Sequence, residues 1–146
     1  MTAAPFVVRR ATEADIPLMR RLWDEFSAEA HYTPYPSGPF DPVLVLDHVA
    51  LVAEEGGEIV GTLYANLSTP HFGYVFGVYT VPGARGRGVG RALMQAVAEH
   101  LREQGREYVV LSVDTANEGA REFYAHLGFE DASRMLRARV DRLLED

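Results

Sequence analysis

The hydrophobic positions of this chain follow two periods, and the change from one to the other divides it into strands and helices. Runs rich in apolar, aromatic and β-branched residues predict strands at 6–10, 51–55, 58–67, 72–81 and 108–114. Apolar residues three and four apart predict helices at 15–30, 89–101 and 117–127, and a short one from 41 to about 49. The mixture predicts an α/β (α+β) fold.

Turn residues fix several of these boundaries. Gly56-Gly57 predicts a tight hairpin between two strands, because both positions of such a turn favour a positive φ. Asp15 is expected to cap the first long helix, and Asn117 the last one. Gly77 interrupts the strand at 72–81, which predicts a bulge or a close backbone approach.

The C-terminal tail gives an ambiguous pattern. Arg134, Leu136, Ala138 and Val140 alternate as in a strand, although the apolar positions of this tail also fit a helix. We expect a closing strand over 133–140. An incompletely closed sheet edge would allow a homodimer by edge pairing.

The segment 31–40 is rich in proline and aromatic residues and cannot form a regular element, because proline fixes φ and lacks a donor. Its aromatic side chains either form a lid over a substrate or cover the core. Tyr32 and Tyr35 are therefore candidate substrate contacts.

A glycine-arginine loop joins the strand at 72–81 to the next helix. Gly86, Gly88 and Gly90 leave backbone N–H groups open to a ligand, and the helix N-terminus favours an anion. The loop also has three arginines, at positions 85, 87 and 91. The pattern predicts a phosphate-binding loop.

Two common phosphate loops do not match this one. A Walker-type loop ends in Gly-Lys-Ser or Gly-Lys-Thr, whereas Gly90 is followed by Arg91 and Ala92. The dinucleotide-binding fingerprint needs glycine at its sixth place, which is Arg91 when counted from Gly86.

Composition narrows the class of protein. The chain has 146 residues, so we expect a single domain over 1–146. With no cysteine and no long apolar run, we expect a soluble, cytoplasmic protein without disulfides or membrane contact. A formal charge of −7 argues against a nucleic-acid partner. The five histidines show no ligand spacing, and we expect no metal site.

Two motifs resemble those of the GCN5-related N-acetyltransferase (GNAT) family. Residues 85–90 match Arg-x-x-Gly-x-Gly, and residues 117–129 match Asn-x-x-Ala-x-x-Phe-Tyr-x-x-x-Gly-Phe. The resemblance implies a GNAT fold, with a mixed, mostly antiparallel sheet, two splayed parallel strands and about four flanking helices. It also implies transfer of an acetyl group from acetyl-CoA to a primary amine of a small molecule or protein.

The resemblance assigns roles to particular residues. The catalytic candidates are the backbone N–H of Val78, as a donor to the developing oxyanion, and Tyr124, as general acid to the departing thiolate. The expected coenzyme A contacts are Val78, Tyr79, Thr80, Arg85, Gly86, Arg87, Gly88, Val89, Gly90, Arg91, Asn117 and Tyr124.

The acceptor side departs from the family pattern. The strand at 72–81 contains no acid, and Ser112 stands where a glutamate is common in the family. His71, His31, Asp114 and Glu54 remain candidate bases. Tyr74 and Phe76, with His71, are expected substrate contacts. A catalytically silent acyl-CoA-binding module is the alternative function.

Overall fold

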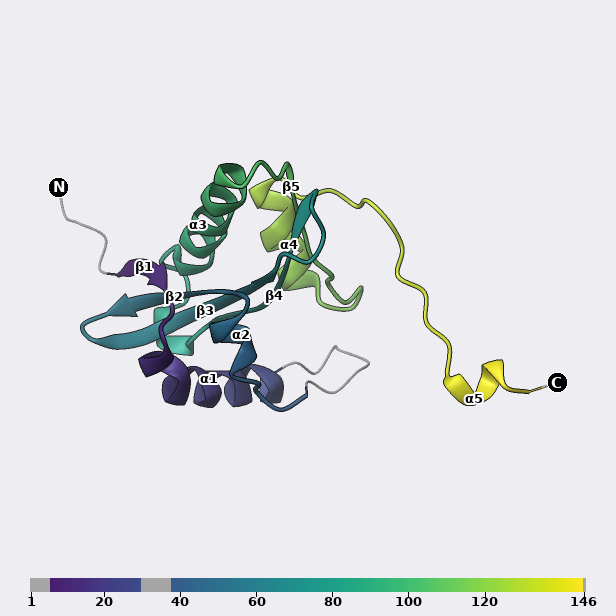
Figure 1. Ribbon diagram of the computed structural model, residues 1–146, viewed down its shortest axis with the longest axis horizontal. Helices are drawn as coiled ribbons and strands as arrows, with labels where there is room; N and C mark the ends of the chain where they lie inside the picture. The colour runs from purple at the N-terminus through teal and green to yellow at the C-terminus, as the bar shows by residue number, and fades with distance from the viewer. Residues whose placement is uncertain (1–5, 30–37, 146) are drawn as a thin grey trace.

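The computed structural model describes residues 6–29 and 38–145, and its centre is a five-stranded mixed sheet (Figure 1). The strands run in the order of the chain: β1 (Val7–Arg10), β2 (Val49–Glu55), β3 (Glu58–Asn66), β4 (Phe72–Thr80) and β5 (Tyr108–Val110). The first four strands pair antiparallel, and β4 and β5 pair parallel. The predicted fold class is confirmed.

Helices cover both faces of the sheet (Figure 1). On one face lie α1 (Ile16–Glu29) and α2 (Val43–Leu46), and on the other lie α3 (Val89–Glu103) and α4 (Glu118–Leu127). The short 3-10 turns η1 (Glu13–Asp15) and η2 (Pro82–Ala84) precede α1 and α3, and α5 (Val140–Leu143) lies near the C-terminus.

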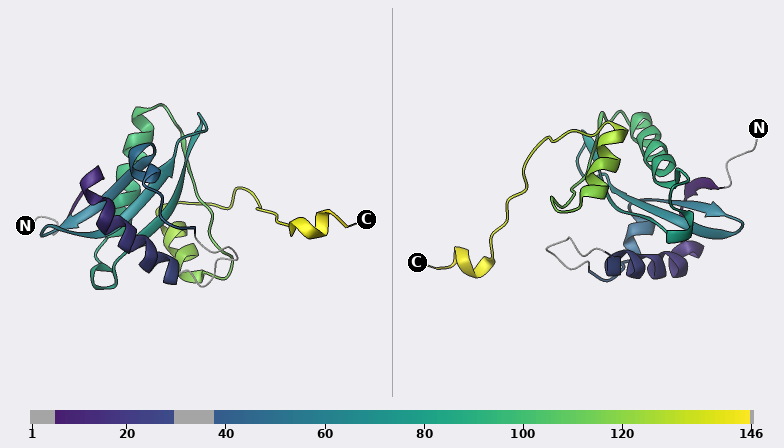
Figure 2. Two further views of the ribbon diagram at one scale, coloured as in Figure 1. Left: turned by 60° about the horizontal axis from the view of Figure 1, so that its bottom comes forward. Right: turned by 180° about the vertical axis from the view of Figure 1, so that it is seen from behind.

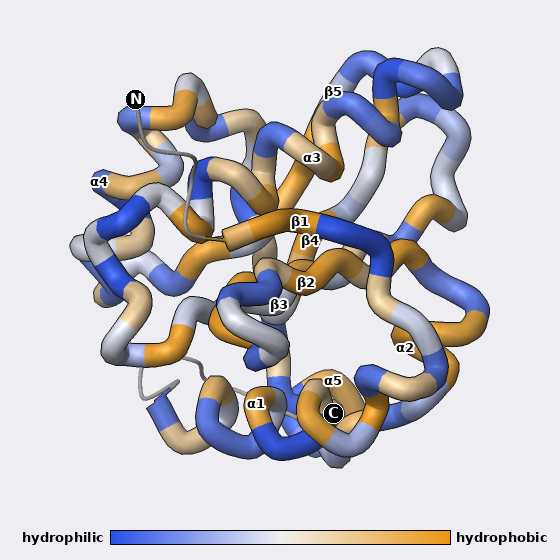
Figure 3. Tube along the Cα trace, turned by 90° about the vertical axis from the view of Figure 1, so that its left-hand side faces the viewer, coloured by the Kyte–Doolittle hydropathy of each residue, from blue (hydrophilic) through white to orange (hydrophobic). Residues whose placement is uncertain are grey.

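The sheet separates two hydrophobic cores. Because side chains alternate along a strand, Leu51 and Ala53 of β2 face α3, whereas Ala50 and Val52 face α1. Figure 3 shows the largely hydrophobic strands between the helical layers. This two-sided burial explains why β2 and β3 contain long apolar runs instead of a strict alternation.

Turn glycines adopt the conformations that the sequence predicts. Gly56 and Gly57 have φ values of 57° and 81° and join β2 to β3 in a hairpin. Gly105 follows α3 with a φ of 73°, and Gly128 ends α4 with a φ of 104°. Asn117 caps α4 by accepting the N–H of Ala120 at 3.1 Å.

Asp15 does not cap α1, contrary to the sequence prediction. It ends η1, where its Oδ2 accepts the N–H of Thr12 at 2.8 Å, and the chain continues directly into α1. Its carboxylate also accepts both terminal nitrogens of Arg9, at 2.8 and 3.0 Å. The Arg9 hydrogen bonds lower the pKa of Asp15 to about 2. Asp15 therefore fastens β1 to the start of α1.

The expected closing strand over 133–140 is wrong. Residues 128–139 form no helix or strand, and Val140–Leu143 form α5 instead. Alternating apolar residues stabilise a strand only when one of its faces is buried, yet Leu136 is 88% exposed. Two other predicted bounds also differ. The short helix expected to reach about 49 ends at Leu46, since β2 already begins at Val49, and the strand expected over 108–114 ends at Val110.

The bulge predicted at Gly77 is confirmed. Between the pairs Thr62↔Tyr79 and Tyr64↔Phe76, β4 has one residue more than β3. Gly77 has a φ of 61°, and Thr62 Oγ1 donates to its carbonyl oxygen at 3.3 Å. This extra residue bends β4 at the point where it separates from β5.

Replacement of Gly77 by alanine should destabilise the protein by about 2–4 kcal/mol. A Cβ at this position would lie 2.6 Å from Tyr64 Cδ2 and 3.1 Å from Trp23 Cζ3, on a backbone with positive φ. Urea unfolding measures the change. Gly119→Ala is the control, because no atom lies within 4 Å of its Cβ position and alanine favours a helix. An equal stability of the two variants would contradict this prediction.

Candidate functional site

A slot opens between β4 and the chain that follows β5. Their parallel ladder contains only the pairs Phe72↔Tyr108, Gly73↔Val109 and Tyr74↔Val110. Beyond it, Tyr74 Oη still donates to Ser112 Oγ at 3.1 Å. Thr80, at the end of β4, has no partner on β5. The edge of β4 from Gly77 to Thr80 is therefore available to a ligand.

Backbone groups of Val78 and Thr80 face this slot. Val81 N donates to Val60 O of the β3 side at 2.9 Å, and Tyr79 pairs with Thr62 of β3. Because successive residues of a regular strand direct their backbone groups to opposite sides, Thr80 directs its groups away from β3. Val78 lies in the bulge and has no paired residue on β3, which leaves its N–H for the slot. The slot edge thus offers N–H donors at both positions, whereas the Thr80 carbonyl already accepts Arg85 Nε at 2.9 Å.

Tyr124 lies on α4, beside the same core that Val78 contacts. Both side chains are partly buried and pack against the cluster between the sheet and α3. The Tyr124 ring lies 5.1 Å from that of Phe123 and 5.5 Å from that of Phe129, centroid to centroid. Burial raises the pKa of the Tyr124 phenol, so the group keeps its proton at neutral pH.

The loop before α3 has the geometry of an anion cradle. Gly86 and Gly88 have φ values of 78° and 85°, and no atom lies within 4 Å of the Cβ position of either. The first bond of the helix runs from Ala92 N to Gly88 O, and in the described structure no side chain caps this N-terminus. The N–H groups from Gly88 to Arg91 are thus available to an anion.

Two of the loop arginines are engaged by carboxylates. Arg85 Nη2 lies 2.7 Å from Glu29 Oε2, and Arg87 Nη1 lies 2.8 Å from Glu55 Oε2. No ion pair of Arg91 is found in the described part of the chain. The positive charge of the loop that remains available to an anionic ligand therefore comes mainly from the backbone amides and Arg91.

Four further residues of the expected cofactor set have clear structural roles. Val89 is buried under the loop at 2% exposure, and Tyr79 is buried against α1. A Cβ at Gly90 would lie 3.0 Å from Phe123 Cζ, so this glycine lets α4 pack against α3. Asn117 Oδ1 is occupied by its cap. These positions were expected to contact the cofactor, and each of them also has a local packing or capping role.

An aromatic wall lies on the α1 face of β4, near the closed end of the slot. Phe76 stacks between Tyr74 and Tyr64, with ring centroids 6.3 and 5.7 Å away, and Trp23 of α1 lies 5.4 Å from Tyr64. Tyr64 is 1% exposed, and its hydroxyl has no hydrogen-bond partner within the described structure. Burial raises its pKa far above the ordinary value.

The sequence did not indicate Trp23 and Tyr64 as part of this wall. Trp23 sits at a helical core spacing, and Tyr64 belongs to a strand that is buried on both faces. Only the pairing of β3 with β4 places Tyr64 beside Phe76. The sequence contains one signal for this wall, which is that two consecutive predicted strands each contain aromatic residues.

The candidate bases do not gather at the slot. His71 precedes β4, at the paired end of the ladder, and Glu54 of β2 binds Arg9 at 3.2 Å. Asp114 accepts the N–H of Ala116 at 2.8 Å, in the turn before α4. His31, Tyr32 and Tyr35 lie outside the described residues.

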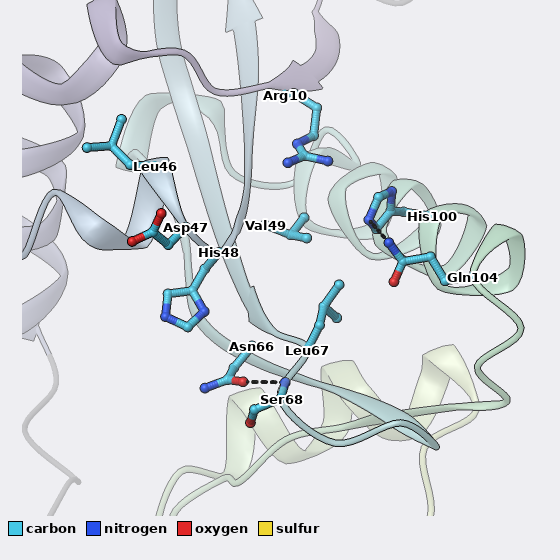
Figure 4. A pocket seen from close by; sticks show the side chains of 10 residues that line it. All are labelled: Arg10, Leu46, Asp47, His48, Val49, Asn66, Leu67, Ser68, His100 and Gln104. Carbon is cyan, nitrogen blue, oxygen red and sulfur yellow. Dashed lines mark hydrogen bonds between the residues drawn. The ribbon is translucent and has the colours of Figure 1, made fainter.

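A separate hollow of about 450 Å³ lies at the other end of the sheet (Figure 4). Its lining includes Arg10 of the edge strand β1, His48 in the bend before β2, Asn66 at the end of β3 and His100 near the end of α3. It contains none of the predicted site residues.

Over residues 6–29 and 38–145, no acidic or histidine cluster is arranged to hold a metal ion. The helices of the same ranges are all too short or too polar to span a bilayer.

Comparison with known proteins adds a family and a fold. Residues 16–129 match the model of the Acetyltransferase (GNAT) family. An uncharacterised N-acetyltransferase of Methanocaldococcus jannaschii is 35% identical over 86 residues, covering 55% of this chain and 38% of that protein. The mycothiol acetyltransferase of Beutenbergia cavernae is 35% identical over 91 residues, covering 62% of this chain and 29% of that protein. The chain thus spans well under half the length of these curated relatives.

A solved structure supports the fold. AAC(6')-Iy in complex with the bisubstrate analogue CoA-S-monomethyl-acetylneamine superimposes with a TM-score of 0.76 at 19% identity. The match covers 92% of this chain and 97% of that one. At this level of identity the likeness establishes a shared fold.

Proposed function

This chain belongs to the GNAT family of acetyltransferases, and on that premise we propose that it transfers an acetyl group from acetyl-CoA to a primary amine. The observation that carries the proposal is the conjunction of an open cradle of N–H groups at 88–91 with a free strand edge at Val78 and Thr80. The loop suits a diphosphate, and the edge suits an amide-rich arm that pairs like a strand. The free strand edge lies at the end of β4, and the cradle of N–H groups lies at the start of α3, the next helix of the chain.

Val78 and Tyr124 have different roles in the proposed acetyl transfer. When bound, acetyl-CoA supplies the thioester. The Val78 N–H points into the slot, where it can stabilise negative charge on a carbonyl oxygen, and such donors typically contribute ~10²–10³ in rate. Tyr124 holds a proton at neutral pH and can donate it to a departing thiolate. The chain has no cysteine, so a direct attack by the amine replaces a thiol-bound acetyl intermediate.

The acceptor is proposed to bind against Tyr74 and Phe76, which the buried Tyr64 supports from behind. Aromatic faces attract a cationic amine and also suit an apolar group. One relative is named for mycothiol, and the superimposed AAC(6')-Iy structure holds an acetylneamine analogue, so the chemical class of the acceptor stays open between small-molecule and protein amines. No acid stands on β4, so a water molecule is the proposed first recipient of the amine proton.

Substitution of Tyr74 tests the acceptor wall. Tyr74→Leu should raise the acceptor KM by about 5–10-fold, because leucine removes the ring face. Tyr74→Phe is the matched control: it keeps the face, removes only the bond to Ser112, and should stay within about 2-fold of the wild type. The Kd for coenzyme A should be unchanged in both. Equal KM values for the two variants would remove the ring face from acceptor binding.

The function itself is tested by incubating the protein with acetyl-CoA and a panel of polyamines, aminoglycosides, amino acids and N-terminal peptides. Release of free thiol reports turnover, and calorimetry reports coenzyme A binding. We expect turnover with at least one amine. Binding of coenzyme A without any turnover would favour the alternative, a silent acyl-CoA-binding module, which the missing acid on β4 supports. Absence of binding would contradict both.

A further inference from the structure

The hollow at the other end of the sheet is separate from the loop and the slot (Figure 4). Helix α3 lies along one face of the sheet (Figures 1 and 2), with the N–H cradle at its first turn and His100 in its last turn. At a rise of about 1.5 Å per residue, His100 lies about 16 Å along the helix from Val89. A ligand in the hollow would therefore not overlap the proposed path of acetyl-CoA.

Arg10, at the end of β1, supplies an unpaired positive charge to this hollow. Its neighbour Arg9 is bound by two carboxylates, Asp15 at 2.8 Å and Glu54 at 3.2 Å. Over residues 6–29 and 38–145, the Arg10 side chain makes no ion pair and no hydrogen bond. Its guanidinium points into the hollow (Figure 4). A free guanidinium presents a planar fork of donors that matches a carboxylate.

The other polar groups of the lining are mainly donors. The Gln104 amide nitrogen lies 3.2 Å from Nε2 of His100. Because an amide nitrogen only donates, Nε2 accepts this bond and Nδ1 carries the ring proton. Asn66 Oδ1 accepts the N–H of Ser68 at 2.8 Å, which leaves the Asn66 amide nitrogen as a further donor. Within the described residues, neither His100 Nδ1 nor Asn66 Nδ2 has a hydrogen-bond partner.

Part of the lining is apolar. Val49, at the start of β2, is 4% exposed, whereas Leu46, at the end of α2, is 58% exposed. Leu67 extends toward the hollow from the chain after β3 (Figure 4). An apolar group bound in the hollow would remove part of the Leu46 side chain from water, which is favourable. The hollow thus combines a cationic side with an apolar side.

The charges around the hollow favour a ligand with one negative charge over a ligand with two. Asp47 is the one acid of the described lining, and it lies across the hollow from His100 (Figure 4). The C-terminus of α3 also has a partial negative charge. Both repel a phosphate dianion more strongly than a carboxylate. A volume of about 450 Å³ is within the range of small-molecule sites.

We propose that this hollow binds a small aliphatic carboxylate, at a site separate from acetyl transfer. Arg10 and His100 hold the carboxylate group, and the alkyl chain lies against Leu46 and Val49. The two ends of such a ligand match the two kinds of side chain that line the hollow. This inference goes beyond the proposed function and does not depend on it.

Nuclear magnetic resonance tests the site, with hexanoate as the probe and the whole chain without acetyl-CoA. Hexanoate at up to about 10 mM should shift the amide signals of Arg10, His48, Val49 and His100 in a saturable way. Hexanamide has nearly the same shape and no charge, and it should bind about 5-fold more weakly or worse. Shifts centred on the slot, no saturable shift, or equal affinities for the two probes would overturn the proposal.

Two variants and a control assign the binding to the hollow. Arg10→Met should weaken hexanoate binding about 5-fold or more, because methionine keeps an apolar side chain and removes the charge. Arg102→Met is the matched control: Arg102 is exposed at the same end of α3, is absent from the lining, and its loss changes the net charge equally. This control should stay within about 2-fold of the wild type.

Leu46→Asp tests the apolar side at a position that is 58% exposed, and it should also weaken binding about 5-fold, because it adds a like charge. The dispersion of the same spectra shows whether each variant is folded. Equal affinities of Arg10→Met and Arg102→Met, or wild-type affinity of Leu46→Asp, would refute the site. These titrations need no turnover, so a failed acetylation assay would not affect them.

Discussion

Replacement of Tyr124 by phenylalanine should lower turnover about 10²-fold or more while the Kd for coenzyme A stays within about 2-fold of the wild type. The ring of Tyr124 packs between Phe123 and Phe129, and phenylalanine preserves that packing. Only the hydroxyl is lost, and with it the proton for the departing thiolate. Steady-state thiol release and calorimetry measure the two quantities.

The raised pKa of Tyr124 predicts how turnover depends on pH. Burial raises the pKa of Tyr124 above the ordinary value of 10, so the acid form is present at all pH values below that range and is lost only above it. Tyr124 should therefore cause no fall in turnover between pH 7 and 10. Tyr108→Phe, which removes a hydroxyl from a tyrosine that is 64% exposed, is the control and should retain full turnover. A Tyr124→Phe variant with wild-type turnover would exclude this phenol from the reaction.

Replacement of Gly88 by alanine should raise the Kd for coenzyme A by about 30–100-fold. Gly88 has a φ of 85° at the N-cap of α3, a conformation that costs alanine about 1 kcal/mol or more. Relaxation of that strain turns the N–H groups of the first helical turn, and the new methyl group enters the open space of the cradle. Titration calorimetry measures the affinity.

Gly83→Ala is the matched control for this loop. The Cβ position of Gly83 is equally open, but Gly83 lies in η2, before the cradle, and its φ is not positive. Its Kd for coenzyme A should match that of the wild type. Thermal unfolding without ligand separates the local strain at Gly88 from the loss of binding. Unchanged affinity in Gly88→Ala would show that the cradle does not hold the cofactor.

Local sequence patterns predicted the parts of this site that depend on neighbours in the chain. Gly56-Gly57 and Gly77 indicated the hairpin turn and the bulge, because the positive φ values of these positions are required by local backbone geometry alone. The loop at 85–91 and the cap at Asn117 were found in the same way. Their side-chain partners were not: Glu29 and Glu55 lie 56 and 32 residues from the arginines that they bind.

The tail shows the limit of such patterns. Its alternation of apolar and polar residues was sufficient to suggest a strand, yet a strand needs a neighbouring edge to satisfy its backbone and cover its apolar face. The sequence of residues 133–140 does not show whether the edge of another strand lies close enough to pair with them. The structure places residues 130–145 away from the sheet (Figure 1).

The sequence by itself determined the order of strands and helices as far as α4, the phosphate-type loop and the family of the chain, since these rest on periodicity, glycine positions and short motifs. The tertiary structure decided which side chains share a surface: the aromatic wall around Tyr64, the carboxylates that hold Arg85 and Arg87, and the free edge of β5. The physical reason is that strand register and helix packing join residues far apart in sequence, and those contacts depend on the whole fold.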